Sequence, residues 1–195
     1  MGNNLDKKEK IIQGAGKLFS EFGWDKTTMK EIAEMANIGK ATLYYYFDDK
    51  MEIYQAAVKN KTEQIKQEIE KAIQEAEDYK SKLIAYVTTR LENIQQICNY
   101  YGQVRVRESI YKNYPVIEEL RQEFDDFEKN LIQNLLSRGV AEGELVIDDI
   151  DLATRAFYAG VRGSEYQVFH QEAIENIEQD VETLMNMIFQ GIEKN

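Results

Sequence analysis

Apolar residues recur at every third or fourth position along almost the whole chain, which is the spacing of one face of an α-helix. The first such run extends from Ile11 to Phe22, and Gly23 follows it at the point where a helix would end. Further runs predict helices over residues 28–36, 39–46, 51–79, 81–99, 102–113, 115–140, 148–170 and 172–193. The pattern therefore predicts an all-α protein of about nine helices.

The positions of proline and glycine agree with this all-α prediction. Pro115, the single proline among 195 residues, falls in the first turn of a predicted helix, where its missing N–H is not needed. Gly139 and Gly143 mark a stop before Leu145. A hydrophobic content of 43% is ample for a buried core, so we expect an ordinary globular protein.

The second and third predicted helices are short and are joined by a sharp turn. Thr28 and Glu31 have the spacing of a capping box, in which each side chain satisfies a free backbone N–H of the first turn. Asn37 stands at the turn, and asparagine tolerates the left-handed backbone conformation. This combination predicts a helix-turn-helix, whose second helix is built to enter the DNA major groove. The residues expected to face inward are Ile32, Ala33, Ala36, Ile38, Leu43 and Phe47.

The second helix of this unit carries three consecutive tyrosines. The residues that the pattern leaves largely outside the core are Gly39, Lys40, Thr42, Tyr44, Tyr45 and Tyr46. Aromatic residues at helical spacing usually pack a core, which is the alternative interpretation of the run. Because the run is in register with a capping box, a turn and lysines, we favour a surface that meets DNA, with at least one tyrosine structural.

The run TTMKEIAEMANIGKATLYYYFDDKMEIY resembles the N-terminal DNA-binding segment of TetR-family transcriptional repressors. The resemblance covers about the first 54 residues, and beyond them it extends only to length and helical character. The sequence departs from the usual family pattern at Asn37, where glycine is frequent, at Gly39, where serine often caps the helix, and at Tyr46, where histidine is frequent. The resemblance implies an N-terminal three-helix DNA-binding domain and a C-terminal helical domain that binds a ligand and forms a homodimer.

The matched positions imply two kinds of DNA contact. Thr27 and Thr28 place hydroxyls and helix N-terminal N–H groups where a phosphate would lie, and Lys50 adds a cation to the same backbone. The residues expected to read base edges are Lys40, Thr42 and Tyr44. Those expected to lie against sugars and donate to phosphates are Tyr45 and Tyr46, and Gly39 completes the predicted DNA-binding set.

Charge divides the chain into two parts. Residues 1–50 carry eight lysines and eight carboxylates, whereas residues 51–195 carry 16 basic and 27 acidic residues, so the net charge of −11 lies entirely in the second part. A neutral segment still binds a polyanion if its lysines share one face. We expect a DNA-binding domain over residues 1–49 and an effector-binding and dimerisation domain over residues 50–195. The helix predicted over 51–79 is expected to span the boundary, and a rod shared by both parts is suited to carry motion between them.

The last two predicted helices have the features of an interface between copies of the chain. The first contains small residues that permit close helix approach, namely Ala153, Ala156, Ala159, Gly160 and Gly163. The second has a near-heptad seam of Ile174, Ile177, Val181, Leu184, Ile188 and Ile192. The resemblance implies a homodimer through these helices, which would read a palindromic operator. The alternative is that both seams close the core of a single protomer.

The middle helices are rich in aromatic residues and contain arginines in an otherwise acidic region. Apolar walls with few polar groups are typical of a small-molecule pocket. The candidate ligand-binding residues are Tyr86, Tyr101, Arg105, Tyr111, Phe127, Tyr158 and Arg162. Each of them also suits a helical core. An inward arginine would favour a carboxylate, phosphate or acyl-CoA effector. Acidic lining would favour a cationic effector. The sequence is compatible with both.

Several other functions lack support in the sequence. The chain has neither a hydrophobic run long enough for a membrane span nor an apolar signal segment, so we expect a cytoplasmic protein. Cys98 and His170 are single residues of their kinds and cannot form a zinc site. Phosphate loops, dinucleotide turns and nucleophile elbows are missing, so we expect neither enzymatic activity nor a cofactor. A helical protein-interaction adaptor is the alternative to a ligand-responsive DNA-binding regulator. The effector, the operator, the regulated genes and the choice between repression and activation cannot be read from the sequence.

Overall fold

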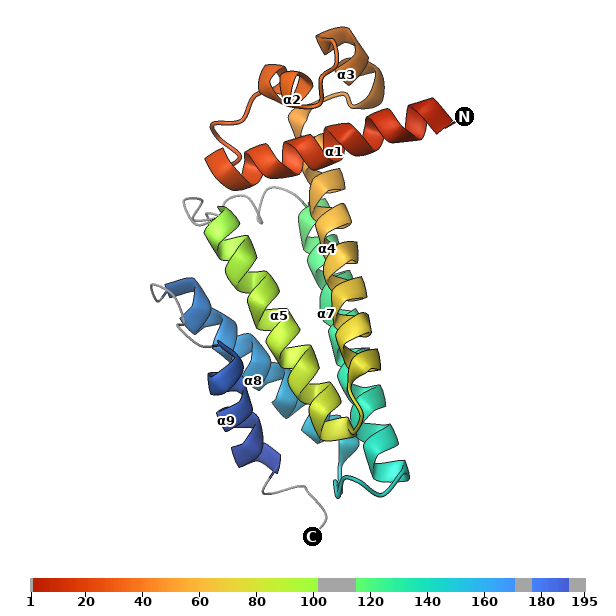
Figure 1. Ribbon diagram of the computed structural model, residues 1–195, viewed down its shortest axis with the longest axis vertical. Helices are drawn as coiled ribbons and strands as arrows, with labels where there is room; N and C mark the ends of the chain where they lie inside the picture. The colour runs from red at the N-terminus through yellow and green to blue at the C-terminus, as the bar shows by residue number, and fades with distance from the viewer. Residues whose placement is uncertain (1, 102–114, 171–176, 190–195) are drawn as a thin grey trace. The chain divides into compact units, whose positions relative to one another are not determined.

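The computed structural model describes residues 2–101, 115–170 and 177–189, and within these ranges the chain forms α-helices and no strand (Figure 1). The helices are α1 (Gly2–Phe22), α2 (Met29–Met35), α3 (Lys40–Tyr46), α4 (Lys50–Glu75), α5 (Tyr79–Tyr101), α7 (Pro115–Ala141), α8 (Ile150–His170) and α9 (Ile177–Phe189). The all-α prediction is confirmed, as are an N-terminal helix-turn-helix and a separate C-terminal helical part. The helix predicted over 102–113 lies outside the described residues.

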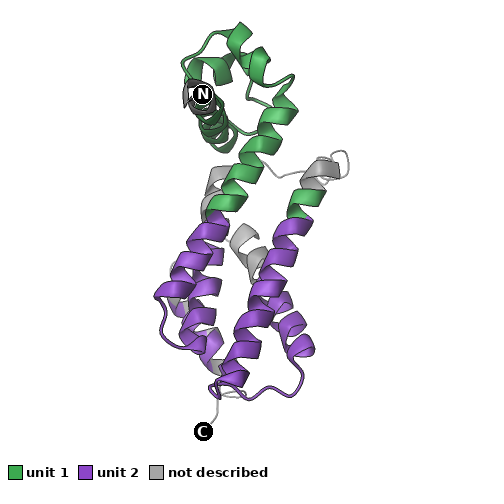
Figure 2. Cartoon of the chain, turned by 90° about the vertical axis from the view of Figure 1, so that its right-hand side faces the viewer, with its two compact units in different colours: residues 1–64, 99–121 green, residues 65–98, 122–195 purple. Residues whose placement is uncertain are grey.

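The chain divides into two compact units (Figure 2). Unit 1 comprises Met1–Gln64 and Asn99–Arg121, and unit 2 comprises Ile65–Cys98 and Gln122–Asn195. Helix α4 contributes its first residues to unit 1 and its last to unit 2. A domain boundary between residues 49 and 50 therefore stays a prediction, since that position is the start of α4 and the division between the units falls within the helix.

The core of unit 1 is formed by α1, α2, α3 and the first turns of α4. The pattern predicted its members well, because Ile11, Ile32, Leu43 and Ile53 are completely buried. A Leu-to-Ala truncation at such a site typically costs about 2–5 kcal/mol. Three aromatic rings complete the core, with centroid separations of 5.1 to 5.7 Å among Phe19, Trp24 and Tyr54. The short helices are thus held by shared packing rather than by their own propensity.

The local signals for the helix-turn-helix are all present in the structure. Thr28 and Glu31 form both hydrogen bonds of the capping box at the start of α2. Asn37 has φ of 53°, the left-handed conformation expected at the turn between α2 and α3. Gly23 ends α1 with φ of 82°, a value that favours glycine. These three positions fix where each helix of the unit begins or ends.

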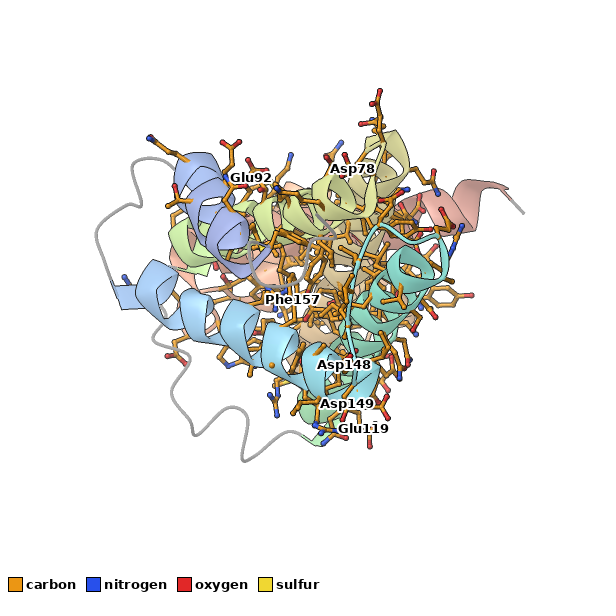
Figure 3. The ribbon with its side chains drawn as sticks, turned by 90° about the horizontal axis from the view of Figure 1, so that it is seen from below. Asp78, Glu92, Glu119, Asp148, Asp149 and Phe157 are labelled. Carbon is orange, nitrogen blue, oxygen red and sulfur yellow. The ribbon has the colours of Figure 1, made fainter. Side chains whose placement is uncertain are left out.

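The core of unit 2 is formed by α5, α7, α8, α9 and the last turns of α4. Ile69, Leu83 and Ile132 are completely buried there. Figure 3 shows Phe157 directed into the interior of this bundle, and its ring lies 6.4 Å from the ring of Tyr86. The charged residues labelled in the same view, such as Asp78 and Glu92, are exposed.

Gly139 has a packing role in unit 2 that differs from the predicted stop. It lies inside α7, and a Cβ at this position would come within 2.6 Å of Leu145 Cδ1. The Gly139 carbonyl accepts hydrogen bonds from the N–H groups of Glu144 and Leu145. Gly143 has φ of 79° and makes the turn itself. Gly139 thus allows the chain after α7 to fold back onto the helix.

The prediction of one helix through residue 79 is wrong. Helix α4 ends at Glu75, and Tyr79 is the first residue of α5. The Ser81 N–H donates to Asp78 Oδ1 over 2.6 Å, so Asp78 caps the new helix. The Tyr79 N–H donates to Glu144 Oε2 over 2.8 Å. Because Glu144 is remote in sequence, the periodicity of apolar residues could not show this break.

Helix α8 is slightly shorter than predicted, and helix α9 is described over part of its predicted range. Helix α8 begins at Ile150 rather than at 148, because Asp149 Oδ1 accepts from the Leu152 N–H over 2.9 Å and caps the helix. Helix α9 covers Ile177–Phe189, within the predicted range of 172–193. The rest of that predicted range lies outside the described residues.

Candidate nucleic-acid interface and buried polar cluster

Helix α3 presents one side of its surface to solvent while its other side is anchored in unit 1. Leu43 and Phe47 are buried and hold the helix. Lys40 is exposed, Tyr44 is 45% exposed and Tyr45 is 75% exposed. Tyr44 and Tyr45 are adjacent, and a contiguous exposed apolar surface often marks an interaction site. The exposed face of α3, defined by Lys40, Tyr44 and Tyr45, is the candidate nucleic-acid interface.

The three tyrosines of α3 are not equivalent. Tyr46 is half-buried and packs against the core of unit 1, whereas Tyr44 and Tyr45 are exposed. The rings of Tyr45 and Tyr46 meet edge to face, with centroids 5.2 Å apart. The expectation that at least one tyrosine is structural is confirmed for Tyr46, which lies further inside than the pattern predicted. Its predicted donation to a phosphate stays a prediction.

The start of α3 has no side-chain cap. Gly39 is the N-cap, and its carbonyl accepts from the N–H groups of Thr42 and Leu43. The Lys40 ammonium lies 5.8 Å from the centre of the Tyr44 ring, so the two side chains share one surface. Thr42 is half-exposed. The predicted base-reading residues Lys40, Thr42 and Tyr44 therefore lie on the first turns of one short helix.

The Thr27 hydroxyl, a predicted phosphate contact, has an internal acceptor, and its contact with a phosphate stays a prediction. Thr27 is 2% exposed, and its Oγ1 donates to the Gly23 carbonyl over 2.8 Å. The Thr28 hydroxyl also has an internal acceptor, because Oγ1 donates to Glu31 Oε2 over 2.8 Å. Donation from the Thr28 side chain and then from its backbone N–H lowers the pKa of the Glu31 carboxyl. Thr27 is thus structural, and a phosphate contact of Thr28 would compete with the capping box.

Lys50, the third predicted phosphate contact, is turned into unit 1. Its ammonium donates to the carbonyls of Trp24 and Thr27 over 2.7 and 2.9 Å. It also lies 4.2 Å from the centre of the Trp24 ring. Partial burial lowers the pKa of Lys50, and the carboxylates of Asp25 and Glu31 oppose that shift. In this structure Lys50 therefore holds the segment between α1 and α2.

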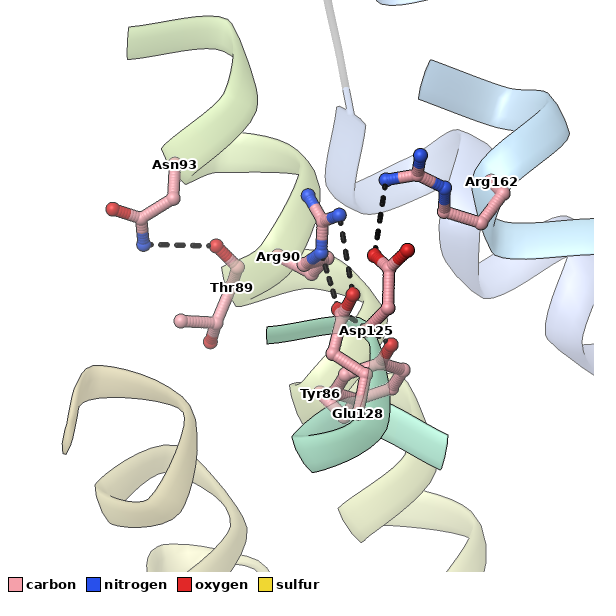
Figure 4. Close-up of polar contacts among 7 residues, drawn as sticks. All are labelled: Tyr86, Thr89, Arg90, Asn93, Asp125, Glu128 and Arg162. Carbon is pink, nitrogen blue, oxygen red and sulfur yellow. Dashed lines mark hydrogen bonds and ion pairs between the residues drawn. The ribbon is translucent and has the colours of Figure 1, made fainter. Parts of the chain in front are cut away.

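A second group of polar side chains lies buried in unit 2 (Figure 4). Arg90 of α5 is 4% exposed and forms a two-pronged ion pair with Glu128 of α7, which is fully buried. The second prong, from Arg90 Nη2 to Glu128 Oε2, measures 3.3 Å. The Tyr86 hydroxyl donates to Glu128 Oε1 over 2.8 Å. Removing one partner of such a buried pair typically costs about 3–5 kcal/mol.

A further ion pair joins α8 to α7 in the same unit. Arg162 Nη1 lies 3.8 Å from Asp125 Oδ1 (Figure 4). Burial, and next the neighbouring Asp125 carboxylate, raise the pKa of the Tyr158 phenol far above its ordinary value. We call Tyr86, Arg90, Asp125, Glu128, Tyr158 and Arg162 the buried polar cluster, of which Tyr86, Arg90 and Glu128 are buried and the other three are partly buried.

The buried polar cluster contains three of the predicted ligand-binding residues. Tyr86, Tyr158 and Arg162 are brought together by two carboxylates of α7. Phe127 is elsewhere on α7, with its ring 6.0 Å from that of Phe124 and 5.4 Å from the Lys66 ammonium. The remaining candidates, the Tyr101 side chain, Arg105 and Tyr111, lie outside the described residues. Ligand binding by any of them stays a prediction.

Three members of the cluster were missed by the sequence interpretation, namely Arg90, Asp125 and Glu128. Asp125 and Glu128 are three residues apart on α7 and therefore lie on one helix face. That spacing was a usable signal, but on an acidic surface it is typical of solvated positions. Arg90 offered no local signal, because its burial depends on a partner 38 residues away.

The predicted interface helices differ in how far they are buried within the protomer. On α8, Leu152 is 56% exposed, and Cβ atoms at Gly160 and Gly163 would meet nothing within 4 Å. On α9, Val181 of the predicted seam is buried in the core of unit 2. The small-residue face of α8 is therefore open, whereas at least one seam residue of α9 closes the protomer's own core.

Metal-binding clusters and membrane-spanning helices are both absent from the described residues. These residues contain no group of three or more His, Cys, Asp or Glu side chains arranged to hold a metal ion. Within the same part of the chain, no helix is both long and apolar enough to cross a membrane.

The short helices α2 and α3 are joined by a sharp turn at Asn37, and α3 has an exposed face. This arrangement is a helix-turn-helix. Residues 11–57 match the family model for bacterial regulatory proteins of the tetR family. The match extends over residues 11–57 of the 195-residue chain, and over this segment the resemblance seen in the sequence is confirmed.

Known proteins resemble this chain in two ways, in the sequence of the N-terminal segment and in the fold. A stretch of 53 residues is 53% identical to the biofilm operon icaADBC HTH-type negative transcriptional regulator IcaR of Staphylococcus epidermidis. That match covers 27% of this chain and 29% of the relative, so it takes in less than a third of either protein. A transcriptional regulator from Cytophaga hutchinsonii is 25% identical, with a TM-score of 0.78 over 95% of this chain and 98% of that one. A TetR transcription regulator from Haloarcula marismortui shares the fold, with a TM-score of 0.80, 16% identity, and 97% and 100% of the two chains covered.

Proposed function

We propose that this protein is a DNA-binding transcriptional regulator that acts as a repressor and is released from its operator by a small apolar or amphipathic effector. The observation that carries the proposal is the exposed face of α3, where Tyr44 and Tyr45 point away from a core that holds the helix through Leu43. The similarity of the N-terminal segment to a negative transcriptional regulator supports repression in particular. The proposal assigns the chain no catalytic step, and its action on DNA implies a cytoplasmic location.

The DNA contacts of α3 follow from the chemistry of its exposed residues. Lys40 can donate to the acceptors of guanine, Thr42 can meet a thymine methyl group, and Tyr44 can lie across a base edge. Tyr45 and Tyr46 carry phenol hydroxyls that suit phosphate oxygens, and such contacts position a protein without reading sequence. Gly39 has no Cβ, which lets the backbone at the start of the helix approach the groove closely.

A homodimer would place two copies of α3 on a two-fold symmetric operator. The open small-residue face of α8 supports an interface there, because small residues permit close approach of a partner helix. The buried position of Val181 supports a smaller share for α9. Paired recognition helices of this class bind half-sites about one helical turn apart.

Effector binding is proposed for unit 2, in the neighbourhood of the buried polar cluster. Charged groups are rarely buried unless they are paired, and ligand sites commonly combine apolar walls with a few such polar groups. Helix α4 belongs to both units, so an effector that favours one position of α4 would alter DNA binding. Effector and DNA must then weaken each other's binding by the same factor.

A helical adaptor that binds proteins and not DNA is the second candidate. It would use the same bundle and the same acidic surface. It gives no reason for the exposure of Tyr44 and Tyr45 next to Lys40. The adaptor predicts no duplex binding at any salt concentration.

The test is a gel shift with DNA from upstream of the protein's own gene, at low and moderate salt, in competition with unrelated duplex. We expect specific binding by the wild type and loss of specificity in Lys40→Ala. The matched control is Lys71→Ala, which removes the same charge from an exposed position of α4 in unit 2 and should bind as the wild type does. Failure of the wild type to bind any duplex would favour the adaptor.

A further inference from the structure

Helix α7, like α4, contributes residues to both compact units. Its residues up to Arg121 belong to unit 1, and those from Gln122 onward belong to unit 2. Leu120, in the first of these two parts, is partly buried and packs against the core formed by α1, α2, α3 and the start of α4. One turn later, Phe124 packs against the core of unit 2. Two successive turns of one helix are therefore anchored in two separate cores.

The face of α7 that carries Leu120 also carries a member of the buried polar cluster. Leu120, Phe124 and Glu128 are spaced four residues apart, so they lie on one face of the helix. The Arg90 guanidinium lies 5.2 Å from the centre of the Phe124 ring and is paired with Glu128. Because backbone hydrogen bonds link each helical turn to the next, a displacement of α7 at Glu128 carries Leu120 with it.

We propose that Leu120 is a positioning residue that ties the core of unit 1 to the Arg90–Glu128 pair, so that a change at this pair reaches the DNA-binding helices through α7 as well as through α4. This inference rests on the proposed function, because it gives effector regulation a second route. The Arg90–Glu128 pair is buried, so a molecule inserted between its partners must displace α7 from α5.

Such a displacement acts on unit 1 because of the way in which Leu120 is packed. A core packed to the density of a protein interior does not deform continuously. Movement of α7 therefore either withdraws Leu120 from the core of unit 1 or shifts the helices that this core holds, α3 among them. Truncation of Leu120 should disconnect unit 1 from events at Glu128.

The first experiment is a double-mutant cycle on duplex affinity, with a labelled duplex from upstream of the protein's own gene. Glu128→Gln removes the charge of the carboxylate and is used in place of an effector. In the wild type we expect it to change duplex affinity by about fivefold or more, the lower end of typical allosteric coupling. In Leu120→Ala we expect little change. An equal fold-change in both backgrounds, or no change in either, would overturn the proposal.

The matched control is Leu135→Ala, which makes the same truncation on the same helix. Leu120 precedes Glu128 by two helical turns, and Leu135 follows it by two, so each lies roughly 10–12 Å from Glu128 along the axis. Leu135, however, is part of the core of unit 2. In Leu135→Ala we expect Glu128→Gln to keep its full effect on duplex affinity. Loss of the effect in this control as well would indicate a general loosening of α7 and would overturn the proposal.

The second experiment needs no DNA. Trp24, the single tryptophan of the chain, packs against the core of unit 1, so quenching of its fluorescence by acrylamide reports on that core. We expect Glu128→Gln to change this quenching in the wild type and to leave it unchanged in Leu120→Ala. Quenching that responds equally in both backgrounds, or in neither, would contradict the role of Leu120.

Tyr86→Phe provides a milder perturbation if Glu128→Gln does not fold, because it removes only the hydroxyl that donates to Glu128. The same dependence on Leu120 is expected for this variant in both experiments. If the wild type itself binds no duplex, the proposed function fails, and the quenching of Trp24 still decides whether Leu120 connects the pair to unit 1.

Discussion

The two units of this protein place their polar side chains in opposite ways. In unit 1, α3 leaves Lys40, Tyr44 and Tyr45 at the surface and keeps an apolar core beneath them. In unit 2, Arg90 and Glu128 are buried together between helices. Exposed polar groups are available to a large, charged partner, whereas buried pairs are available only to a molecule that enters the bundle. The difference agrees with a macromolecular partner for unit 1 and a small one for unit 2.

The largest effect is expected from breaking the buried ion pair of unit 2. Glu128→Ala leaves Arg90 charged and buried without its carboxylate, so the free energy of unfolding should fall by about 3–5 kcal/mol. Urea unfolding followed by circular dichroism would measure the change. Glu123→Ala on the exposed side of α7 is the control and should have little effect. Equal stability of the two variants would show that the pair contributes nothing to the fold.

The next largest effect on stability is expected from replacing glycine by alanine at two positions with different surroundings. In Gly139→Ala the new Cβ would press against Leu145 Cδ1 at 2.6 Å, and overpacking of this kind costs about 1–3 kcal/mol. In Gly16→Ala the Cβ meets nothing within 4 Å, so the higher helix propensity of alanine should stabilise α1 by up to about 1 kcal/mol. Thermal unfolding of both variants checks the opposite signs. A stabilised Gly139→Ala would contradict the close approach of Leu145.

The smallest effect concerns the capping box of α2. Thr28→Val removes the hydroxyl and should cost about 1 kcal/mol at neutral pH. The hydroxyl donates to Glu31 and lowers the pKa of that carboxyl from its ordinary value of 4.5. A group whose pKa is lowered by folding stabilises the protein above the ordinary value and loses this contribution as the pH falls through the lowered one.

The stability difference between wild type and Thr28→Val should therefore shrink as the pH falls below about 4.5. Unfolding curves measured across this pH range test the expectation. A difference that stays constant into strong acid would mean that the Glu31 carboxylate takes no part in the cap.

The helix-turn-helix could be predicted from the sequence because its signals are local. Thr28, Glu31 and Asn37 act through neighbours within a few residues, and the structure has all three in their expected roles. The outward position of Tyr44 and Tyr45 followed from the same helical register. Periodicity and turn chemistry are sufficient when each partner lies within one or two turns.

The features that the sequence did not predict depend on contacts between residues that are distant in sequence. The carbonyl acceptors of Lys50 lie 23 and 26 residues away, and Thr27 is buried, and neither fact can be read from the local pattern. The break before Tyr79 needs Glu144, and the burial of Arg90 needs Glu128. No local pattern contains these pairings, so they become evident only in the three-dimensional structure.

The most direct test of the central claim is a nuclease footprint of the protein on DNA from upstream of its own gene. If the exposed face of α3 reads DNA, the wild type should protect two half-sites separated by about one helical turn. Tyr44→Ala should lose this protection and keep its helical content. Protection that is identical for the two proteins, or no protection by the wild type, would contradict the role assigned to α3.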